Sequence, residues 1–319
     1  AMVNVCDTVG GIPTRNFSRG RFEGAEAISG DTIKELNESR GGDISHACMA
    51  GCTIKCSNVY VGPDGEPLVT PLEYETIGLM GSNLEIDDPD VIARLNDICN
   101  DMGLDTIDVG AALGIAAEAG CMPFGDGQRA LELMEKVKQD TPLGRIIGCG
   151  AALAGQVLGV TRVPVVKGQA LSAYDPRAVK GTGVTYVTSP QGADHTSGLT
   201  IRAKVDHSSA EGQVKLSCGA QYNAAGYDSL GACVMGGFGF GLDPTIIPDL
   251  INARYGWDVG ENYLQELGRA SILMEREFNR QAGFTKEDDR LPEWMTLEKL
   301  PPLDAVFDVP QEELDSIFD

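Results

Sequence analysis

The chain has 319 residues, of which 47 are Asp or Glu and 25 are Lys or Arg, so its net charge at pH 7 is -22. Such a charge repels nucleic acid and anionic membrane surfaces, and we expect neither as a partner. Apolar residues make up 42% and charged residues 23%, which excludes disordered, collagen-like and disulfide-dense classes, and no run of about 20 apolar residues predicts a membrane span.

The first half of the chain is predicted to consist mostly of helices. The clearest one spans residues 88–102, where Asp88 is a good N-cap, Pro89 fits the first helical position and apolar residues recur every three or four positions. A small hairpin is expected around residues 59–65, because Gly-Pro-Asp-Gly at 62–65 is a typical turn. Other helices are predicted for 31–38, 105–119, 126–138 and the almost wholly apolar, and therefore buried, stretch 141–158.

The composition changes at residues 159–190, where Pro, Gly and Val dominate without a helical period. We therefore predict a boundary near 165 and two helical domains, 1–165 and 166–319. The fold class is mainly α with little β, since alternating strand and helix units of a Rossmann fold or TIM barrel are not seen. Downstream helices are predicted for 193–206, 208–220, 243–254 and 258–281.

Nine cysteines without a visible secretion signal indicate a reducing compartment, so we expect a cytoplasmic protein without structural disulfides. Cys48, Cys52 and Cys56 follow one another at intervals of four residues. An iron–sulfur cluster needs several soft thiolates close together, and such a triplet plus one remote cysteine can supply them. A loop that holds a cluster is the favoured interpretation. Cys233, beside a glycine turn, is the candidate for the fourth ligand, with burial as a small apolar residue as the alternative.

Two alternatives to a cluster loop stay open at this point. A spacing of four would place the three cysteines on one face of a helix, as small core residues, although Gly51 and the β-branched pair Thr53-Ile54 weaken a helix there. A radical-SAM cluster is disfavoured, because its triplet has one residue fewer in the second gap and an aromatic residue where this chain has Lys55.

Taken together, these segments resemble the tungsten-containing aldehyde:ferredoxin oxidoreductase family, specifically its second and third domains. The resemblance covers nearly the whole chain, and its strength lies in the order and spacing of its segments. The family's N-terminal pterin-cradle domain has no counterpart here, so we expect a fragment or one subunit of a split enzyme, inactive alone. The matching segments are 12–17, 22–26, the cysteine triplet, 73–76, 81–83, 100–106, 175–177, 186–189, His195, 228–233, 283–285 and 287–292.

The resemblance implies two cofactors. One [4Fe-4S] cluster would be ligated by Cys48, Cys52, Cys56 and Cys233. A tungsten (or molybdenum) bis-pterin, shared with the N-terminal domain, would be held by two loops. The first loop carries Asn100, Gly103, Leu104 and Asp105, and the second carries Asp228 and Gly231.

The first of these loops departs from the family pattern. Asn100 stands where the family has Asp, which predicts a weaker contact because an amide oxygen accepts hydrogen bonds without charge. Without the resemblance, Gly103 and Asp105 are simply a helix C-cap and the N-cap of the next helix.

Two residues are candidates for catalysis by the same resemblance. Glu75 would be the general base that takes a proton from water attacking an aldehyde, with Glu73 as a less favoured choice. His195 would donate a hydrogen bond to a substrate oxygen or an oxygen on the metal. Taken alone, Glu75 is a surface carboxylate in a charged patch and His195 a structural histidine.

The function that the resemblance implies is oxidation of an aldehyde to a carboxylic acid, with electrons passed through the cluster to ferredoxin. Two alternatives stay open: a relative that reduces an aromatic acyl-CoA thioester, and a non-catalytic cluster-binding subunit for electron transfer or assembly. The expected partners are ferredoxin or a similar carrier, the cradle domain and an aldehyde substrate. A homo-oligomer is left open.

Overall fold

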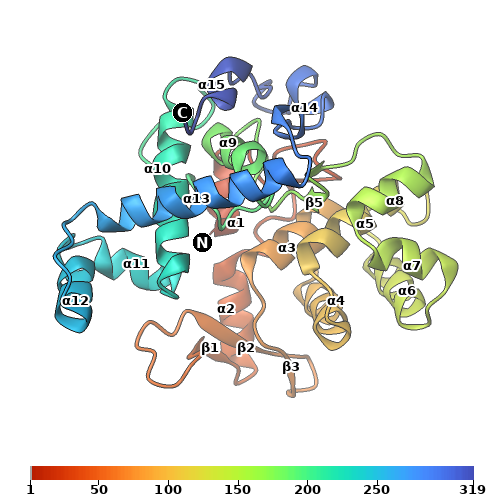
Figure 1. The fold of residues 1–319 in the computed structure, drawn as a ribbon. Helices are drawn as coiled ribbons and strands as arrows, with labels where there is room; N and C mark the ends of the chain where they lie inside the picture. The colour runs from red at the N-terminus through yellow and green to blue at the C-terminus, as the bar shows by residue number, and fades with distance from the viewer. Residues whose placement is uncertain (1) are drawn as a thin grey trace. The chain divides into compact units, whose positions relative to one another are not determined.

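The computed structural model describes residues 2–319, which form two compact units. Unit 1 runs to Val179 and also includes Leu291–Asp308, whereas unit 2 consists of Lys180–Arg290 and Val309–Asp319. Helices dominate the chain and strands are few and short, which confirms the predicted mainly α class (Figure 1). The domain boundary predicted near residue 165 stays a prediction.

Unit 1 is built around the helix α5, whose residues from Val109 to Ala117 are all buried. Gly110 permits close packing against α3, since a Cβ at this position would lie 2.7 Å from the Cβ of Leu79. The helices of the unit are α1 (Met2–Thr8), α2 (Gly30–Ser39), α3 (Tyr74–Met80), α4 (Pro89–Met102), α5 (Thr106–Glu118), α6 (Gly127–Lys138), α7 (Pro142–Gly148), α8 (Ala151–Leu158) and α14 (Trp294–Leu297), with a 3-10 turn η1 (Ser82–Leu84).

A small antiparallel sheet in unit 1 has the strand order β1-β2-β3. It consists of β1 (Asp43–His46), β2 (Ser57–Val61) and β3 (Pro67–Val69), and Tyr60 pairs with Val69 across the β2–β3 hairpin that the turn at 62–65 predicts. The connection from β1 to β2 carries the cysteine triplet. A second ribbon pairs β4 (Val165–Val166) with β5 (Gln169–Ala170).

The helices predicted in unit 1 are confirmed within one or two residues, except the one over 141–158. That prediction is wrong, because the backbone breaks at Gly150, whose φ is +89°. The carboxylate of Asp108 accepts a hydrogen bond from the backbone N–H of Ala151 at 3.0 Å and so begins a new helix there. The prediction that the whole stretch is buried is also wrong, because Val157 of α8 is 54% exposed.

Unit 2 is organised by the two long helices α10 and α13, which pack against each other (Figure 1). Their crossing is tight, because a Cβ at Gly268 would overlap the carbonyl oxygen of Tyr222 and one at Gly226 would lie 2.5 Å from the carbonyl oxygen of Leu264. The elements are α9 (Lys180–Thr188), α10 (Gln213–Ser229), α11 (Val234–Phe240), α12 (Ile246–Tyr255), α13 (Tyr263–Gln281), η2 (Lys286–Asp288) and α15 (Gln311–Asp315).

The helix predicted over 193–206 is wrong, and α9 was not predicted. The Asp194 side chain accepts from the backbone N–H of Thr196 at 2.8 Å, which forms a turn in place of a helical hydrogen bond. All nine residues of α9 are buried, so the helix has no polar face and shows no period in the sequence. The helix predicted over 208–220 begins at Gln213 and continues to Ser229, which places Asp228 in its last turn.

No helix among residues 2–319 is long and apolar enough to cross a membrane.

Candidate functional site

The three cysteines of the triplet lie together on the loop between β1 and β2. Cys48 and Cys56 are exposed and Cys52 is half-buried, so the loop is not a helix with a buried cysteine stripe. The loop turns through left-handed backbone at Gly51 (φ +82°) and Lys55 (φ +50°). Backbone N–H groups of Lys55 and Ile54 point at the Cys52 sulfur and lower the pKa of this thiol.

The donor set on this loop has the chemistry that a cluster requires: three thiols on nine residues, one of them with a lowered pKa. The thiols are not arranged as a finished binding site, since the described part of the chain contains no group of three or more Cys, His, Asp or Glu side chains placed to hold a metal ion. Cys233 is exposed in unit 2, at the N-cap position of α11.

The first predicted pterin loop joins α4 to α5. Gly103 ends α4 in the left-handed conformation (φ +67°), and its N–H bonds the carbonyl oxygen of Asn100 at 3.3 Å. The N–H of Leu104 reaches the carbonyl oxygen of Cys99 at 2.8 Å, which completes a Schellman-type helix end. Asp105 then caps α5, because its carboxylate accepts from the N–H groups of the second and third residues that follow it.

The second predicted pterin loop joins α10 to α11. Gly231 has left-handed backbone (φ +65°), and its N–H donates to the carbonyl oxygen of Asp228 at 2.9 Å. The N–H of Ala232 donates to the carbonyl oxygen of Tyr227, also at 2.9 Å. The Asp228 side chain is exposed and lines a cavity of about 280 Å³. Partial burial and the negative charge of Asp194 raise the pKa of Asp228.

The residues of this cavity fit the pterin that the second loop is expected to hold. Gln221, on the same face of α10 as Asp228, is buried, and its Oε1 has no hydrogen-bond partner among the described residues. Glu275 of α13 also lines the cavity. Neither Gln221 nor Glu275 was predicted from the sequence as a binding residue. The seven-residue interval from Gln221 to Asp228 would have pointed to the former, had the helix been extended past residue 220.

Glu75 lies in the first turn of α3 and is half-buried. Its Oε2 accepts a hydrogen bond from the backbone N–H of Ala173 at 2.7 Å, which orients the carboxylate. The neighbouring hydroxyl of Tyr74 donates to the carbonyl oxygen of the same Ala173 at 2.6 Å, so both polar groups of one residue are held by α3. The alternative candidate, Glu73, is exposed and precedes the helix.

The segment that holds Glu75 is itself anchored by a buried ion pair. Asp175 and Arg177 are both fully buried, with Nη2 and Oδ2 2.7 Å apart, and the guanidinium lies 5.1 Å from the centre of the Trp294 ring. These residues match one of the family segments, but the sequence did not show their role. A buried pair with this geometry fixes the backbone around Ala173.

His195 lies in unit 2, on the turn after α9. Its Nδ1 is 3.5 Å from a carboxylate oxygen of Asp194, and its side chain is 18% exposed. Asp194 is also the residue whose charge acts on Asp228, so His195 and Asp228 belong to one polar neighbourhood of unit 2. Glu75 and the cysteine triplet belong to unit 1.

The family profile described as "Aldehyde ferredoxin oxidoreductase, domains 2 & 3" matches residues 1–317. The chain belongs to the aldehyde ferredoxin oxidoreductase family. This match confirms the resemblance drawn from the sequence segments. Relatives of this chain within the family include tungsten-containing enzymes.

Relatives of known name include the tungsten-containing aldehyde ferredoxin oxidoreductase of Thermococcus kodakarensis, 31% identical over 94% of this chain and 52% of its own length. The corresponding enzyme of Pyrococcus furiosus is 30% identical over the same shares. The chain therefore spans about half the length of these aldehyde ferredoxin oxidoreductases. The aliphatic sulfonate oxidoreductase WOR-like subunit of P. furiosus is 30% identical over 48% of this chain and 28% of its own length.

A solved structure shares the fold. The active-site complex BamBC of benzoyl coenzyme A reductase, bound to 1,5-dienoyl-CoA, superimposes with a TM-score of 0.70. The alignment covers 98% of this chain and 54% of that one, with 14% sequence identity. The fold of this chain is thus also found in that benzoyl coenzyme A reductase complex.

Proposed function

We propose that the chain is the C-terminal module of a tungsten (or molybdenum) bis-pterin oxidoreductase that oxidises aldehydes to carboxylic acids. The observation that carries the proposal is the exposed three-cysteine loop of unit 1 in a chain that belongs to this family. One [4Fe-4S] cluster held by this chain's cysteines would supply the one-electron transfer to ferredoxin or a similar carrier. The cradle domain that completes the pterin site comes from another part of the protein or another subunit.

Four thiols are proposed as cluster ligands: Cys48, Cys52 and Cys56 of unit 1 and Cys233 of unit 2. All are exposed or half-buried, whereas Cys6 and Cys99 are buried and burial raises the pKa of each to about 12. A thiol with such a pKa is a poor ligand, because a ligand must be a thiolate. This contrast argues against Cys6 and Cys99 as ligands, and the choice among the other seven cysteines rests on the family resemblance.

The bound pterin–metal group supplies the two-electron redox chemistry, and the chain's own residues bind and orient it. The two helix–glycine–helix turns are proposed to hold it, through Asn100, Gly103, Leu104 and Asp105 in the first turn and through Asp228 and Gly231 in the second.

Glu75 and His195 are proposed to act on the substrate. The net reaction takes an aldehyde and water to a carboxylic acid, two protons and two electrons. Glu75 accepts a proton from the water as its oxygen bonds the carbonyl carbon, and the hydrogen bond from Ala173 holds the carboxylate in orientation. His195 donates a hydrogen bond to the substrate oxygen. The hydrogen bond from Ala173 to Glu75 and the 3.5 Å approach of His195 Nδ1 to Asp194 hold the two side chains in position.

Metal analysis of anaerobically purified protein tests the proposal. About four irons per chain are expected, since a [4Fe-4S] cluster has four iron atoms. Cys52→Ser is expected to abolish the iron and the visible cluster absorption. Cys121→Ser is the matched control, because Cys121 is another half-buried cysteine outside the ligand set, and it should leave both unchanged.

The outcomes separate the candidate functions. Equal effects of the two substitutions would contradict the ligand assignment. A full complement of iron in a protein that does not oxidise aldehydes, even with the cradle domain and tungsten supplied, would favour the non-catalytic electron-transfer subunit.

A further inference from the structure

The cavity beside Asp228 is a formed site within unit 2. One face of α10 supplies Gln221, Ala225 and Asp228, at positions i, i+4 and i+7, and α13 supplies Ile272 and Glu275. Its volume of about 280 Å³ is just below the range of about 300–1,000 Å³ that is usual for drug-sized ligands. The cavity therefore suits one fused ring system and is too small for a whole bis-pterin.

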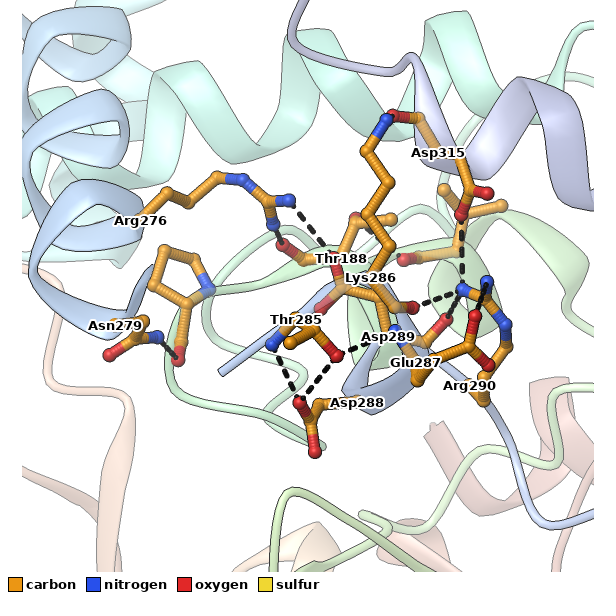
Figure 2. A network of polar contacts seen from close by, with 12 residues as sticks. Thr188, Arg276, Asn279, Thr285, Lys286, Glu287, Asp288, Asp289, Arg290 and Asp315 are labelled. Atoms are coloured by element: carbon orange, nitrogen blue, oxygen red, sulfur yellow. Dashed lines mark hydrogen bonds and ion pairs between the residues drawn. The ribbon is translucent and has the colours of Figure 1, made fainter. Parts of the chain in front are cut away.

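The third wall of the cavity is the segment after α9, and α13 holds it in place. Arg276 donates to the carbonyl oxygen of Thr188 at 2.8 Å and to the carboxylate of Asp289 at 2.9 Å (Figure 2). Asn279 donates to the carbonyl oxygen of Pro190 at 2.6 Å. The two bonds bracket Ser189, which lines the cavity and is fully buried. The wall is thus fixed by contacts between residues far apart in the sequence.

The orientation of the Gln221 amide is determined by its neighbours. Its Nε2 donates to Thr188 Oγ1 at 2.8 Å and to Ser217 Oγ at 3.1 Å. The hydroxyl proton of Thr188 is already donated to the carbonyl oxygen of Val184 at 2.7 Å, so Thr188 can only accept from Gln221. The nitrogen must therefore face the hydroxyls, and Oε1 is left as an acceptor without a partner in the described chain. Gln221 is only 1% exposed, and a buried acceptor without a donor is costly.

Two other polar side chains of the cavity, Asp228 and Glu275, can only accept hydrogen bonds when ionised, whereas its serines and Gln191 can also donate. Asp228 and Glu275 contribute carboxylates, and none of the side chains that line the cavity in the described residues is Lys, Arg or His. Their negative charges act on each other, because the charge of Asp228 contributes, after partial burial, to a raised pKa of Glu275. A metal ion does not explain the site, since residues 2–319 contain no cluster of three or more Cys, His, Asp or Glu side chains placed for one. The chemistry that would complete it is an edge of N–H donors.

We infer that Gln221 and Glu275 join Asp228 in recognising the N–H-bearing aminopyrimidinone edge of one pterin. This inference rests on the function proposed above and adds two recognition residues to its second pterin turn. The edge carries an amino group and a ring N–H side by side, and a carboxylate accepts two parallel N–H bonds well. An additional acceptor at the buried Gln221 oxygen makes the site selective for a ring that has the amino group.

The test is fluorescence titration of the full chain with two free ring compounds. Pterin carries the 2-amino group beside its ring N3–H, whereas lumazine has a 2-oxo group in that place and N–H at both N1 and N3. We expect pterin to bind at least about tenfold more tightly, because acceptors placed for the 2-amino group would face the 2-oxo acceptor of lumazine instead. Glu275→Gln should weaken pterin binding by about tenfold, as expected for loss of a charged acceptor, and lumazine binding much less. Glu277→Gln is the matched control, since Glu277 is an exposed residue of the same helix paired with Arg280, and it should change neither.

Equal affinity for the two rings, or an unchanged pterin affinity in Glu275→Gln, would overturn the inference. Gln221→Leu removes the buried acceptor but also the hydrogen bonds to Thr188 and Ser217. If that variant does not fold, Glu275→Gln still decides the test, because Glu275 is exposed and its replacement leaves the packing intact. Iron analysis of the same preparation separates the two proposals. Iron present without ring selectivity contradicts the recognition residues only, whereas selectivity without iron contradicts the cluster and supports the recognition residues.

Discussion

The two helix–glycine–helix turns of the molecule have the same backbone and different endings. In both, a residue in the last turn of a helix accepts from the N–H of a left-handed glycine three positions later: Asn100 with Gly103 and Asp228 with Gly231. The glycine φ angles are +67° and +65°. Asp105 and Cys233 occupy equivalent positions, two residues after the glycine, as N-caps of the next helices.

The side chains at these equivalent positions are used differently. The carboxylate of Asp105 is engaged by two backbone N–H groups of α5, whereas the Cys233 side chain makes no cap hydrogen bond. Asp228, in turn, faces a cavity with an unpartnered acceptor. The first turn thus uses its side chain to support its own helix, whereas the equivalent side chain of the second turn makes no such contact, although the backbones are alike.

The largest effect is expected at the position that distinguishes the turns. Cys233→Ser should abolish the iron of the anaerobic protein, because a hydroxyl is a poor ligand for a site built of thiolates. The equivalent change in the first turn, Asp105→Ser, should leave iron unchanged, since Ser is also a good N-cap. Iron retained in Cys233→Ser would show that the two turns do not differ in this way.

The shared backbone predicts equal costs at the two glycines. Gly103→Ala and Gly231→Ala should each lower the free energy of unfolding by about 1–2 kcal/mol, because an L-residue is strained in the left-handed region. Steric overlap adds nothing, since a Cβ at either position has no neighbour within 4 Å. Urea denaturation measures this, with Gly239→Ala as the control, a glycine equally open but without positive φ. Clearly unequal costs would contradict the structural equivalence.

The carboxylates of the two turns should respond differently to removal. Asp105→Ala is expected to cost about 1 kcal/mol of unfolding free energy, the usual value of an N-cap. Asp228→Ala should cost much less, because no backbone N–H depends on its side chain in the described structure. The same urea experiments compare the two variants. A larger loss in Asp228→Ala would show that this residue is structural.

The smallest effect concerns pH. Burial and Asp194 raise the pKa of Asp228 above that of the unfolded chain, so its ionised form disfavours the folded state at neutral pH. Asp228→Asn should therefore stabilise the protein, by less than about 0.5 kcal/mol because the exposed carboxylate is screened by solvent. The gain should disappear as pH falls below the ordinary carboxyl pKa of about 4, where Asp228 is protonated in both states. A gain that persists in acid would assign it to another cause.

Much of unit 1 could be predicted from the sequence, because its elements are specified by local signals. The N-cap Asp88, the Pro at the start of α4 and the glycine at its end are each read within a few residues, and the structure confirms all three. The break in the predicted helix 141–158 was missed because it depends on Asp108, more than 40 residues earlier, whose carboxylate caps α8. In unit 2, α9 was missed because a helix buried on every side has no amphipathic period.

The sequence by itself determined the family, the mainly α class, the cysteine loop and the two glycine turns, since these depend on residue identity and short-range hydrogen bonds. Only the tertiary structure decided what each polar side chain does. Asp105 is used as a helix cap, Glu75 is oriented by the distant Ala173, and Gln221 is turned so that its oxygen is buried without a partner among the described residues. The physical reason is that a donor or acceptor is free or satisfied according to partners from other elements, and folding alone brings those partners together.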